Sequence, residues 1–146
     1  MATLEHAIML ATQAHAGQVD RAGQPYILHP LRVMLAVSGV ESQCAAVLRD
    51  VVEDTAITWA DLRALGFAEP VLAAVFALTK QQGESRLAAA YRAAINPIAR
   101  VVKLADVTDN MNMNRIAQPT PKDWARLEEY QQVKAVLLAA MDGHEQ

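Results

Sequence analysis

The chain has 146 residues, a length that suits one domain, and 53% of them are apolar, which is ample for a core. Charged residues make up 20%, too few for a disordered chain. The formal net charge is −3 and the isoelectric point about 5.8, which argues against a nucleic-acid polymer bound through a basic surface. A small anionic ligand stays compatible with this charge, because a few local cations suffice to hold it. We therefore expect a single domain over residues 1–146.

The single cysteine, Cys44, excludes an intrachain disulfide, and its apolar helical setting favours a buried structural thiol. The first ten residues carry an acidic residue and no basic start, unlike a secretory signal. The apolar runs are far shorter than the ~20 residues that cross a bilayer. These features predict a cytoplasmic protein without a membrane partner.

Helical periodicity dominates the first third of the chain. Leu4, Ile8 and Ala11 predict a helix over residues 3–16, which the glycine-rich segment 17–26 ends. Pro30 is typical of the first residue of a second helix. Ser42 can cap a third helix that runs to residue 52.

The rest of the chain repeats this pattern of caps, apolar periodicity and breakers. Thr58 can cap a short helix, with Asp61 three residues later, and the helix that Pro70 starts is apolar enough to be buried. Further helices are expected over residues 58–66, 70–78, 85–95, 97–111 and 123–141. No convincing strand pattern or repeat is present. The prediction is an all-α fold of about seven or eight helices.

An acidic cluster marks the third predicted helix. Asp50, Glu53 and Asp54 stand at positions i, i+3 and i+4, which places them on one helix face. A solvated acidic surface would explain this face as well as a functional site would. The apolar remainder of the helix leaves little room for a purely exposed face, which favours the site.

A second polar group lies in the segment VVKLADVTDNM. Asp106 follows core-like residues directly, and Lys103 and Asn110 lie on its helix face, at −3 and +4. A carboxylate can bind a metal, an ammonium group a phosphate, and an amide a hydroxyl, so the three together could form a binding site. The alternative is a local salt bridge from Lys103 to Asp106 or Asp109.

Two upstream features could join these carboxylates. His29, directly before a proline, is either a metal ligand or a hydrogen-bonding residue at the start of a helix. Arg21, next to Asp20 in the glycine-rich segment, could meet a phosphate or stack on a base, or could be a solvated loop charge. No GxxxxGK, GxGxxG or CxxC motif is present, so the sequence does not support a nucleotide-binding fold of those types or a zinc ribbon.

The motifs AHAGQ with GQPYILHP, AAVLRDVVEDT, and VVKLAD with DNM resemble, in order and spacing, the hydrolase domain of the RelA/SpoT proteins. They resemble most closely its stand-alone small alarmone hydrolases. The resemblance covers roughly residues 5–115. It implies an HD-domain, PDEase-like helical bundle that uses Mn²⁺ to remove the 3′-pyrophosphate of guanosine tetra- or pentaphosphate (ppGpp-like nucleotides).

The resemblance also implies roles for single residues. It assigns metal ligation to His29, Asp50 and Asp106, handling of the attacking water to Glu53 and Asp54, and substrate binding to Arg21, Lys103 and Asn110. The chain departs from the family pattern at Arg49, where the pairing histidine is expected. It also departs at Asp20, where a basic residue is usual, and at Met113, where a threonine is common. Lys80 and Arg86 are further candidates for offsetting phosphate charge.

Arg49 decides how the metal site is interpreted. A guanidinium has no lone pair to give and stays protonated, so Arg49 cannot be a ligand. Either it points into the site and replaces the metal with a fixed positive charge paired with Asp50, Asp106 or Glu53, or it swings away and a metal binds loosely. Repulsion between a guanidinium and a divalent cation favours the first arrangement.

Two main hypotheses of function follow. The first is a metal-dependent phosphohydrolase or pyrophosphohydrolase of a guanosine polyphosphate or related nucleotide, impaired by Arg49. The alternative is an inactive HD-fold protein that binds a nucleotide or a partner protein, or keeps only the scaffold. The amphipathic last helix could cover its own core or a neighbouring copy, so a homodimer is also considered.

Overall fold

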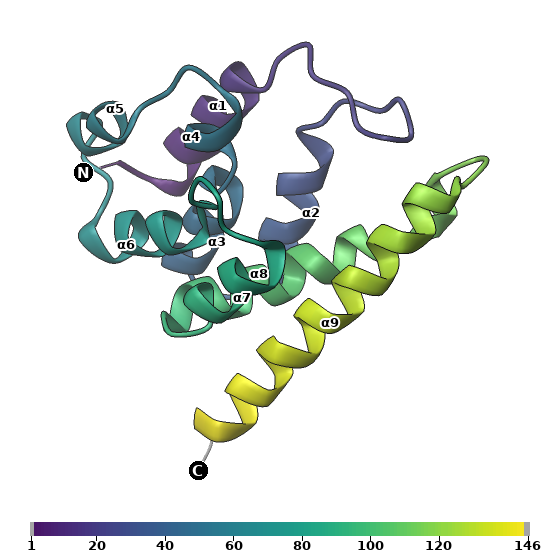
Figure 1. Cartoon of the computed structure of the whole chain (residues 1–146). Coiled ribbons are helices and arrows are strands. Elements are labelled where there is room, and N and C mark those ends of the chain that lie inside the picture. Colours follow the sequence, from purple (N-terminus) through teal and green to yellow (C-terminus); the bar gives the residue numbers. More distant parts are fainter. Residues whose placement is uncertain (1, 145–146) are drawn as a thin grey trace.

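The computed structural model describes residues 2–144, and the regular elements in this part of the chain are all helices, as predicted (Figure 1). Its one β-type contact is an isolated bridge between Val19 and Pro25. The elements in chain order are α1 (Leu4–Ala14), α2 (Leu28–Ala36), α3 (Val40–Leu48), α4 (Val51–Asp54), α5 (Trp59–Ala64), α6 (Glu69–Leu78), α7 (Arg86–Ala93), α8 (Pro97–Asn110), the 3₁₀ turn η1 (Met113–Arg115) and α9 (Pro121–His144).

Several helices begin at the side chains that the sequence marks as caps. The Thr58 hydroxyl accepts the N–H of Asp61, and the Asp61 carboxylate accepts the N–H of Thr58, so an aspartate completes this capping box. The Asn96 side chain accepts two backbone N–H groups at the start of α8, where Pro97 needs no donor. These local contacts explain why the predicted and observed helix starts agree there.

Several expected boundaries of the second and third helices are wrong. The helix predicted to start at Pro30 begins two residues earlier, at Leu28, since a proline in the first turn has no N–H to leave unpaired. The predicted third helix is two helices, because the backbone turns between α3 and α4 at Arg49 and Asp50. Its first helix also starts earlier, after Gly39, whose φ of 93° is costly for other residues.

The larger core surrounds α3, which contacts α1, α2, α6 and α8. Every residue of α3 from Cys44 to Leu48 is buried, including the cysteine, as expected for a structural thiol. The apolar α6 is buried on the face that carries Val71, Leu72 and Val75, and exposes Phe76. Burial of α3 on all sides fixes the position of the turn that follows it, which carries Arg49 and Asp50.

A smaller core fastens the long α9 to α7 and α8. It is formed by Ala90, Ala94, Val107, Val133 and Leu137. Figure 1 shows α9 running along the outside of the helical body, with its ends beyond its neighbours. The last helix therefore covers a core of its own chain. Within residues 2–144, no helix combines the length and the apolar character that crossing a membrane requires.

Candidate functional site

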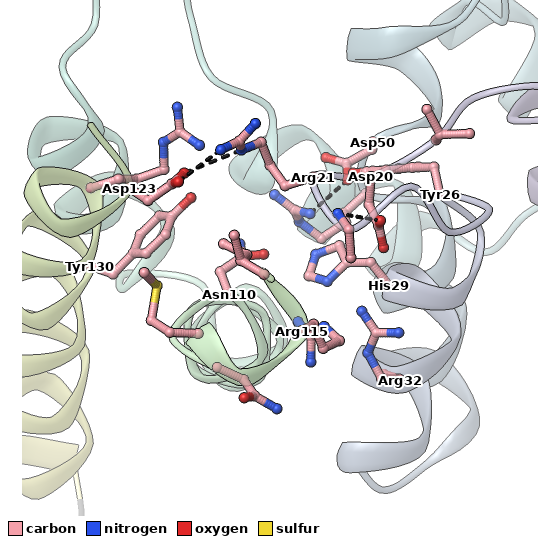
Figure 2. Close-up of a pocket in the computed structure, with 17 residues that line it drawn as sticks. Asp20, Arg21, Tyr26, His29, Arg32, Asp50, Asn110, Arg115, Asp123 and Tyr130 are labelled. Carbon is pink, nitrogen blue, oxygen red and sulfur yellow. Dashed lines mark hydrogen bonds and ion pairs between the residues drawn. The ribbon is translucent and has the colours of Figure 1, made fainter. Parts of the chain in front are cut away.

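A cavity of about 540 Å³ lies where five distant parts of the chain meet. Its walls come from the glycine-rich loop, the start of α2, the turn between α3 and α4, the end of α8 with η1, and the first turns of α9. Figure 2 shows side chains from these segments pointing toward one another across the cavity. Among the predicted site residues, Arg21, His29, Asp50 and Asn110 line it, together with Arg49.

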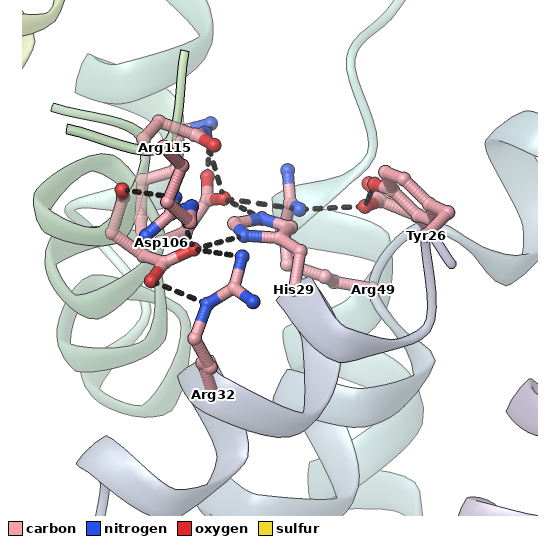
Figure 3. A network of polar contacts seen from close by, with 10 residues as sticks. Tyr26, His29, Arg32, Arg49, Asp106 and Arg115 are labelled. Atoms are coloured by element: carbon pink, nitrogen blue, oxygen red, sulfur yellow. Dashed lines mark hydrogen bonds and ion pairs between the residues drawn. The ribbon is translucent and has the colours of Figure 1, made fainter. Parts of the chain in front are cut away.

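The structure brings His29, Asp50 and Asp106 together, as the sequence predicts, and all three side chains are buried. His29 Nε2 lies 2.8 Å from Asp106 Oδ1. Arg49 Nη1 lies 2.7 Å from Asp50 Oδ2 and 3.2 Å from Asp106 Oδ1. The two carboxylates are thus joined through a guanidinium (Figure 3).

Arg49 points into the site and pairs with Asp50 and Asp106, as in the first of its two expected arrangements. Its side chain is buried and forms part of the cavity wall. Burial alone would lower the pKa of Arg49, but the charges of Asp106 and Asp50 outweigh it and raise the pKa above its usual range. The site therefore contains a permanent positive charge where the family pattern has a histidine.

His29 is held at both ring nitrogens. Nε2 faces Asp106, and Nδ1 lies 2.6 Å from Asp109 Oδ2. Burial opposes its protonation, but the hydrogen bonds to Asp106 and Asp109 prevail and raise the pKa of His29. Both ring nitrogens thus lie within hydrogen-bond distance of a carboxylate oxygen, and these two contacts orient the ring between Asp106 and Asp109.

The donor set does not fit the divalent ion that the family implies. Among residues 2–144, no group of three or more His, Cys, Asp or Glu side chains is arranged to hold a metal. A guanidinium lies between the carboxylates of Asp50 and Asp106, and the imidazole of His29 donates to one of them. The expected metal ligands His29, Asp50 and Asp106 do lie together, but the cation between the two carboxylates is the Arg49 guanidinium.

Asp106 connects the network. Its carboxylate accepts hydrogen bonds from His29, from Lys103 Nζ at 3.2 Å and from Asn110 Nδ2 at 3.2 Å. Burial alone would raise its pKa, but the charges of Arg49 and Lys103 and the bond from His29 hold the pKa far below its usual range. The local ion pair considered for Lys103 is therefore present, and Lys103 does not line the cavity.

Sequence reasoning missed the residues that surround this centre. The Asp109 carboxylate accepts hydrogen bonds from Arg32 Nε at 2.8 Å and from Arg32 Nη2 at 3.1 Å. It also contacts His29 and Arg115. Burial would raise its pKa, but these donors lower the pKa of Asp109 to about 2. Tyr26 donates its hydroxyl to Asp50. One signal could have found Arg32: it stands three residues after His29, on the same face of α2.

Glu53 and Asp54 lie outside this network. Both are exposed on α4, whereas Asp50, directly before this helix, is buried. The Asp54 N–H donates to the Asp50 carbonyl at 2.9 Å, so the backbone between them keeps helical spacing. Partial burial and the nearby charge of Asp50 raise the pKa of both Glu53 and Asp54. A carboxylate with a raised pKa is better able to exchange a proton near neutral pH.

Arg21 closes the opposite side of the cavity. Its guanidinium donates from Nε at 3.2 Å and from Nη2 at 2.7 Å to the two oxygens of Asp123, in the first turn of α9 (Figure 2). Asp20 instead accepts the N–H groups of Ala22 and Gln24 and so stabilises its own turn. Arg86 lies over the ring of Tyr130 and, like Lys80, is not part of the wall.

The cavity is rich in cations although the whole chain is acidic. Five arginines line it: Arg21, Arg32, Arg49, Arg115 and Arg126. Its three acidic wall residues, Asp20, Asp50 and Asp123, each accept hydrogen bonds from the protein. Planar guanidinium groups suit phosphate oxygens, so the wall is chemically matched to a ligand with several phosphates.

Comparison with known proteins places this geometry in a family. The chain is 32% identical to the bifunctional (p)ppGpp synthase/hydrolase SpoT of Escherichia coli, over 74% of the chain. It is 31% identical to the guanosine-3′,5′-bis(diphosphate) 3′-pyrophosphohydrolase of Aquifex aeolicus, also over 74%, and 36% identical to the GTP pyrophosphokinase of Streptomyces coelicolor, over 77%. It spans 15–17% of the length of these relatives.

A solved structure shows the same fold. It is that of a metazoan SpoT orthologue described as hydrolysing ppGpp, and it superimposes with a TM-score of 0.79 over 98% of this chain and 87% of the other, at 24% identity. No model of a known protein family matches the chain. On its sequence relatives and its fold, this chain belongs to the RelA/SpoT family of HD-domain hydrolases.

Proposed function

We propose that this chain is a pyrophosphohydrolase domain that acts on a guanosine polyphosphate or a closely related nucleotide. The observation that carries the proposal is the cavity: five arginines gather around His29 and Asp50 in a chain of this family. Several guanidinium groups on one wall can offset the charge of adjacent phosphates, which a single cation cannot do.

The wall residues divide the work of binding. Asp109 holds Arg32 and Arg115, each of which keeps further donors for phosphate oxygens. Arg21 reaches the cavity from the glycine-rich loop. Asn110, which lines the cavity, is proposed to contact the ribose. Lys103 acts at a distance, through its charge and its bond to Asp106.

Glu53 and Asp54 are proposed to orient the attacking water and to accept its proton. Their raised pKa supports this role, since it brings a carboxylate closer to the range in which it exchanges protons. Both residues stand on α4, directly after Asp50, which lines the cavity. Their exposure leaves them accessible to water.

The residues of the site do not fit the Mn²⁺ that the family implies, because the Arg49 guanidinium lies between the carboxylates of Asp50 and Asp106. The same observation favours a second function, binding of the nucleotide without turnover. Arg49 holds the position from which the family pattern ligates the metal, so a ligand could bind while the reaction is slow or absent.

Three further expectations accompany the proposal and rest on the sequence. They are a cytoplasmic location, a single domain over residues 1–146, and a ligand that is a small nucleotide rather than a nucleic-acid polymer. A homodimer also stays a prediction.

The test is release of pyrophosphate from guanosine tetraphosphate by the purified chain, with and without added Mn²⁺. The proposed hydrolase releases pyrophosphate, and Asp106→Asn abolishes the release while the helical circular dichroism spectrum is kept. Thermal stabilisation by the nucleotide without release identifies the second function. If the nucleotide causes neither pyrophosphate release nor thermal stabilisation, both proposed functions are contradicted.

A further inference from the structure

We propose that the Arg49 guanidinium is the built-in counter-cation of this site, so that the chain binds a pyrophosphoryl-bearing ligand without any divalent ion. The proposal rests on the proposed function in one respect, namely that such a ligand enters the arginine-lined cavity. It departs from the family expectation of a metal-dependent site.

Donors of the protein already occupy three of the four oxygens of the Asp50 and Asp106 carboxylates. Oδ2 of Asp50 accepts from both Arg49 and Tyr26. Oδ1 of Asp106 accepts from His29 and Asn110, and its Oδ2 accepts from Lys103. A metal would have to displace several of these donors at once, in a place where most of the surrounding side chains are buried.

Positive charge is also already present beside Asp106. Arg49 Nη1 and Lys103 Nζ each lie 3.2 Å from an Asp106 oxygen, so the protein itself supplies charge that a metal would supply. A divalent ion at the same point would be repelled by each of them, and buried charges are screened weakly. Arg49 therefore replaces the ion rather than assisting it.

Part of the Arg49 guanidinium is not paired with the carboxylates. Its Nη1 is paired, whereas its Nε is buried without a hydrogen-bond partner in the described part of the chain. The side chain also forms cavity wall. A buried, unsatisfied donor is uncommon in folded proteins, and this one belongs to a guanidinium that faces a cavity suited to anions. The geometry indicates a group held in place for a ligand.

The direct test is Mn²⁺ binding, measured by electron paramagnetic resonance of the free ion with no nucleotide present. Wild type is expected to leave the free Mn²⁺ signal unchanged at equimolar concentration. Arg49→His supplies an imidazole beside Asp50 and is expected to bind Mn²⁺ at least tenfold more tightly. Arg63→His, at an exposed arginine far from the cavity wall, is the matched control and is expected to behave as wild type. Stoichiometric Mn²⁺ binding by wild type, equal to that of Arg49→His, would overturn the proposal.

A second measurement separates this inference from the proposed function. Calorimetric titration with guanosine tetraphosphate in EDTA is expected to show binding by wild type, with an affinity within about threefold of that found with Mn²⁺. In EDTA, the affinity of Arg49→Gln for the nucleotide is expected to be at least tenfold lower than that of wild type. The affinity of Arg49→Lys should fall less, and that of Arg63→Gln should not change. Circular dichroism confirms that each variant is folded.

The outcomes are distinguishable. Binding that requires Mn²⁺ would overturn the metal-independent site and leave the proposed nucleotide function intact. Absence of binding in both conditions would overturn the nucleotide function and, with it, the role of Arg49 toward a ligand. Binding in EDTA that does not change in Arg49→Gln would show that the other arginines suffice, which also overturns the proposal.

Discussion

The buried carboxylate of Asp106 has an unusual density of partners. It accepts from His29, Lys103 and Asn110 and lies 3.2 Å from Arg49 Nη1. A buried charge is tolerated only when its partners are present, and each partner here is itself desolvated. Asp106 is therefore as much a structural residue as a candidate functional one.

Asp106→Asn should lower the free energy of unfolding by about 3 kcal/mol, because Arg49 and Lys103 lose the charge that balances them. Urea unfolding followed by circular dichroism measures the change. Asp142→Asn, the same substitution at an exposed position of α9, should stay within about 0.5 kcal/mol of wild type. Equal stability of the two variants would show that the network contributes little.

The residues of this centre differ in how far sequence could identify them. His29, Asp50 and Asp106 stand in motifs whose order and spacing carry the family resemblance. The bonds of Asp109 with His29 and Arg32, and the pairing of Tyr26 with Asp50, could not be predicted, since they depend on how α2 packs against α8 and on the loop before α2. Long-range partners of this kind have no periodic signature in the sequence.

At the scale of elements, the break between α3 and α4 is the main feature that periodicity conceals. Val47, Val51 and Val52 continue the apolar pattern across it, so one helix is predicted where two exist. The ion pair between Arg49 and Asp50 forms at this turn, between neighbours that a regular helix would direct apart. The helices themselves could be predicted because caps and apolar spacing are local signals.

The docking of α9 provides an element-scale prediction. Leu137 is fully buried against α7 and α8, while its neighbour Leu138 is 45% exposed. Leu137→Ala should lower the free energy of unfolding by about 3 kcal/mol, since it leaves a cavity in the smaller core. Leu138→Ala should cost less than about 1 kcal/mol, as measured by the same urea titration. A similar loss in both variants would contradict the packing described for α9.

The connection between α6 and α7 should respond to pH. Arg92 donates to Glu84 at 2.8 Å and to the Thr79 carbonyl at 2.6 Å, and so ties the end of α6 to α7. Hydrogen bonds from Arg92, followed by that from the Gln81 N–H, lower the pKa of Glu84 to about 2. An unfolded glutamate titrates near ~4.3, so this contribution is complete above that pH and is lost as pH falls toward 2.

Thermal unfolding between pH 5 and pH 2.5 checks this sign. Wild type should lose more stability over the interval than Glu84→Gln, which has no carboxylate to protonate at this position. Glu69→Gln, at an exposed glutamate paired with Arg63, is the control and should follow wild type. Parallel curves for wild type and Glu84→Gln would exclude a role of Glu84 in acid stability.

At the scale of the whole molecule, a chain with net charge −3 concentrates five arginines around one cavity. Composition alone could not predict this, because the arginines come from distant segments and gather only in the folded chain. The all-α fold could be predicted, since it follows from local periodicity. The resulting local field should attract anions that the average charge would repel.

Affinity for guanosine tetraphosphate should therefore depend on ionic strength. Raising NaCl from 50 to 300 mM should weaken binding roughly three- to tenfold, because exposed charges such as Arg21 become screened. Calorimetry at several salt concentrations measures this, with uncharged guanosine as the control ligand. A salt-independent affinity for the tetraphosphate would mean that the arginines do not face the phosphates.

The central claim is that a guanidinium, not a metal, lies between Asp50 and Asp106. It is tested most directly by crystals of the protein grown with Mn²⁺ and measured near the manganese absorption edge. The account predicts no anomalous density among His29, Asp50 and Asp106, and density for the Arg49 guanidinium between the two carboxylates. A strong anomalous peak at that point, with Arg49 turned away, would contradict it.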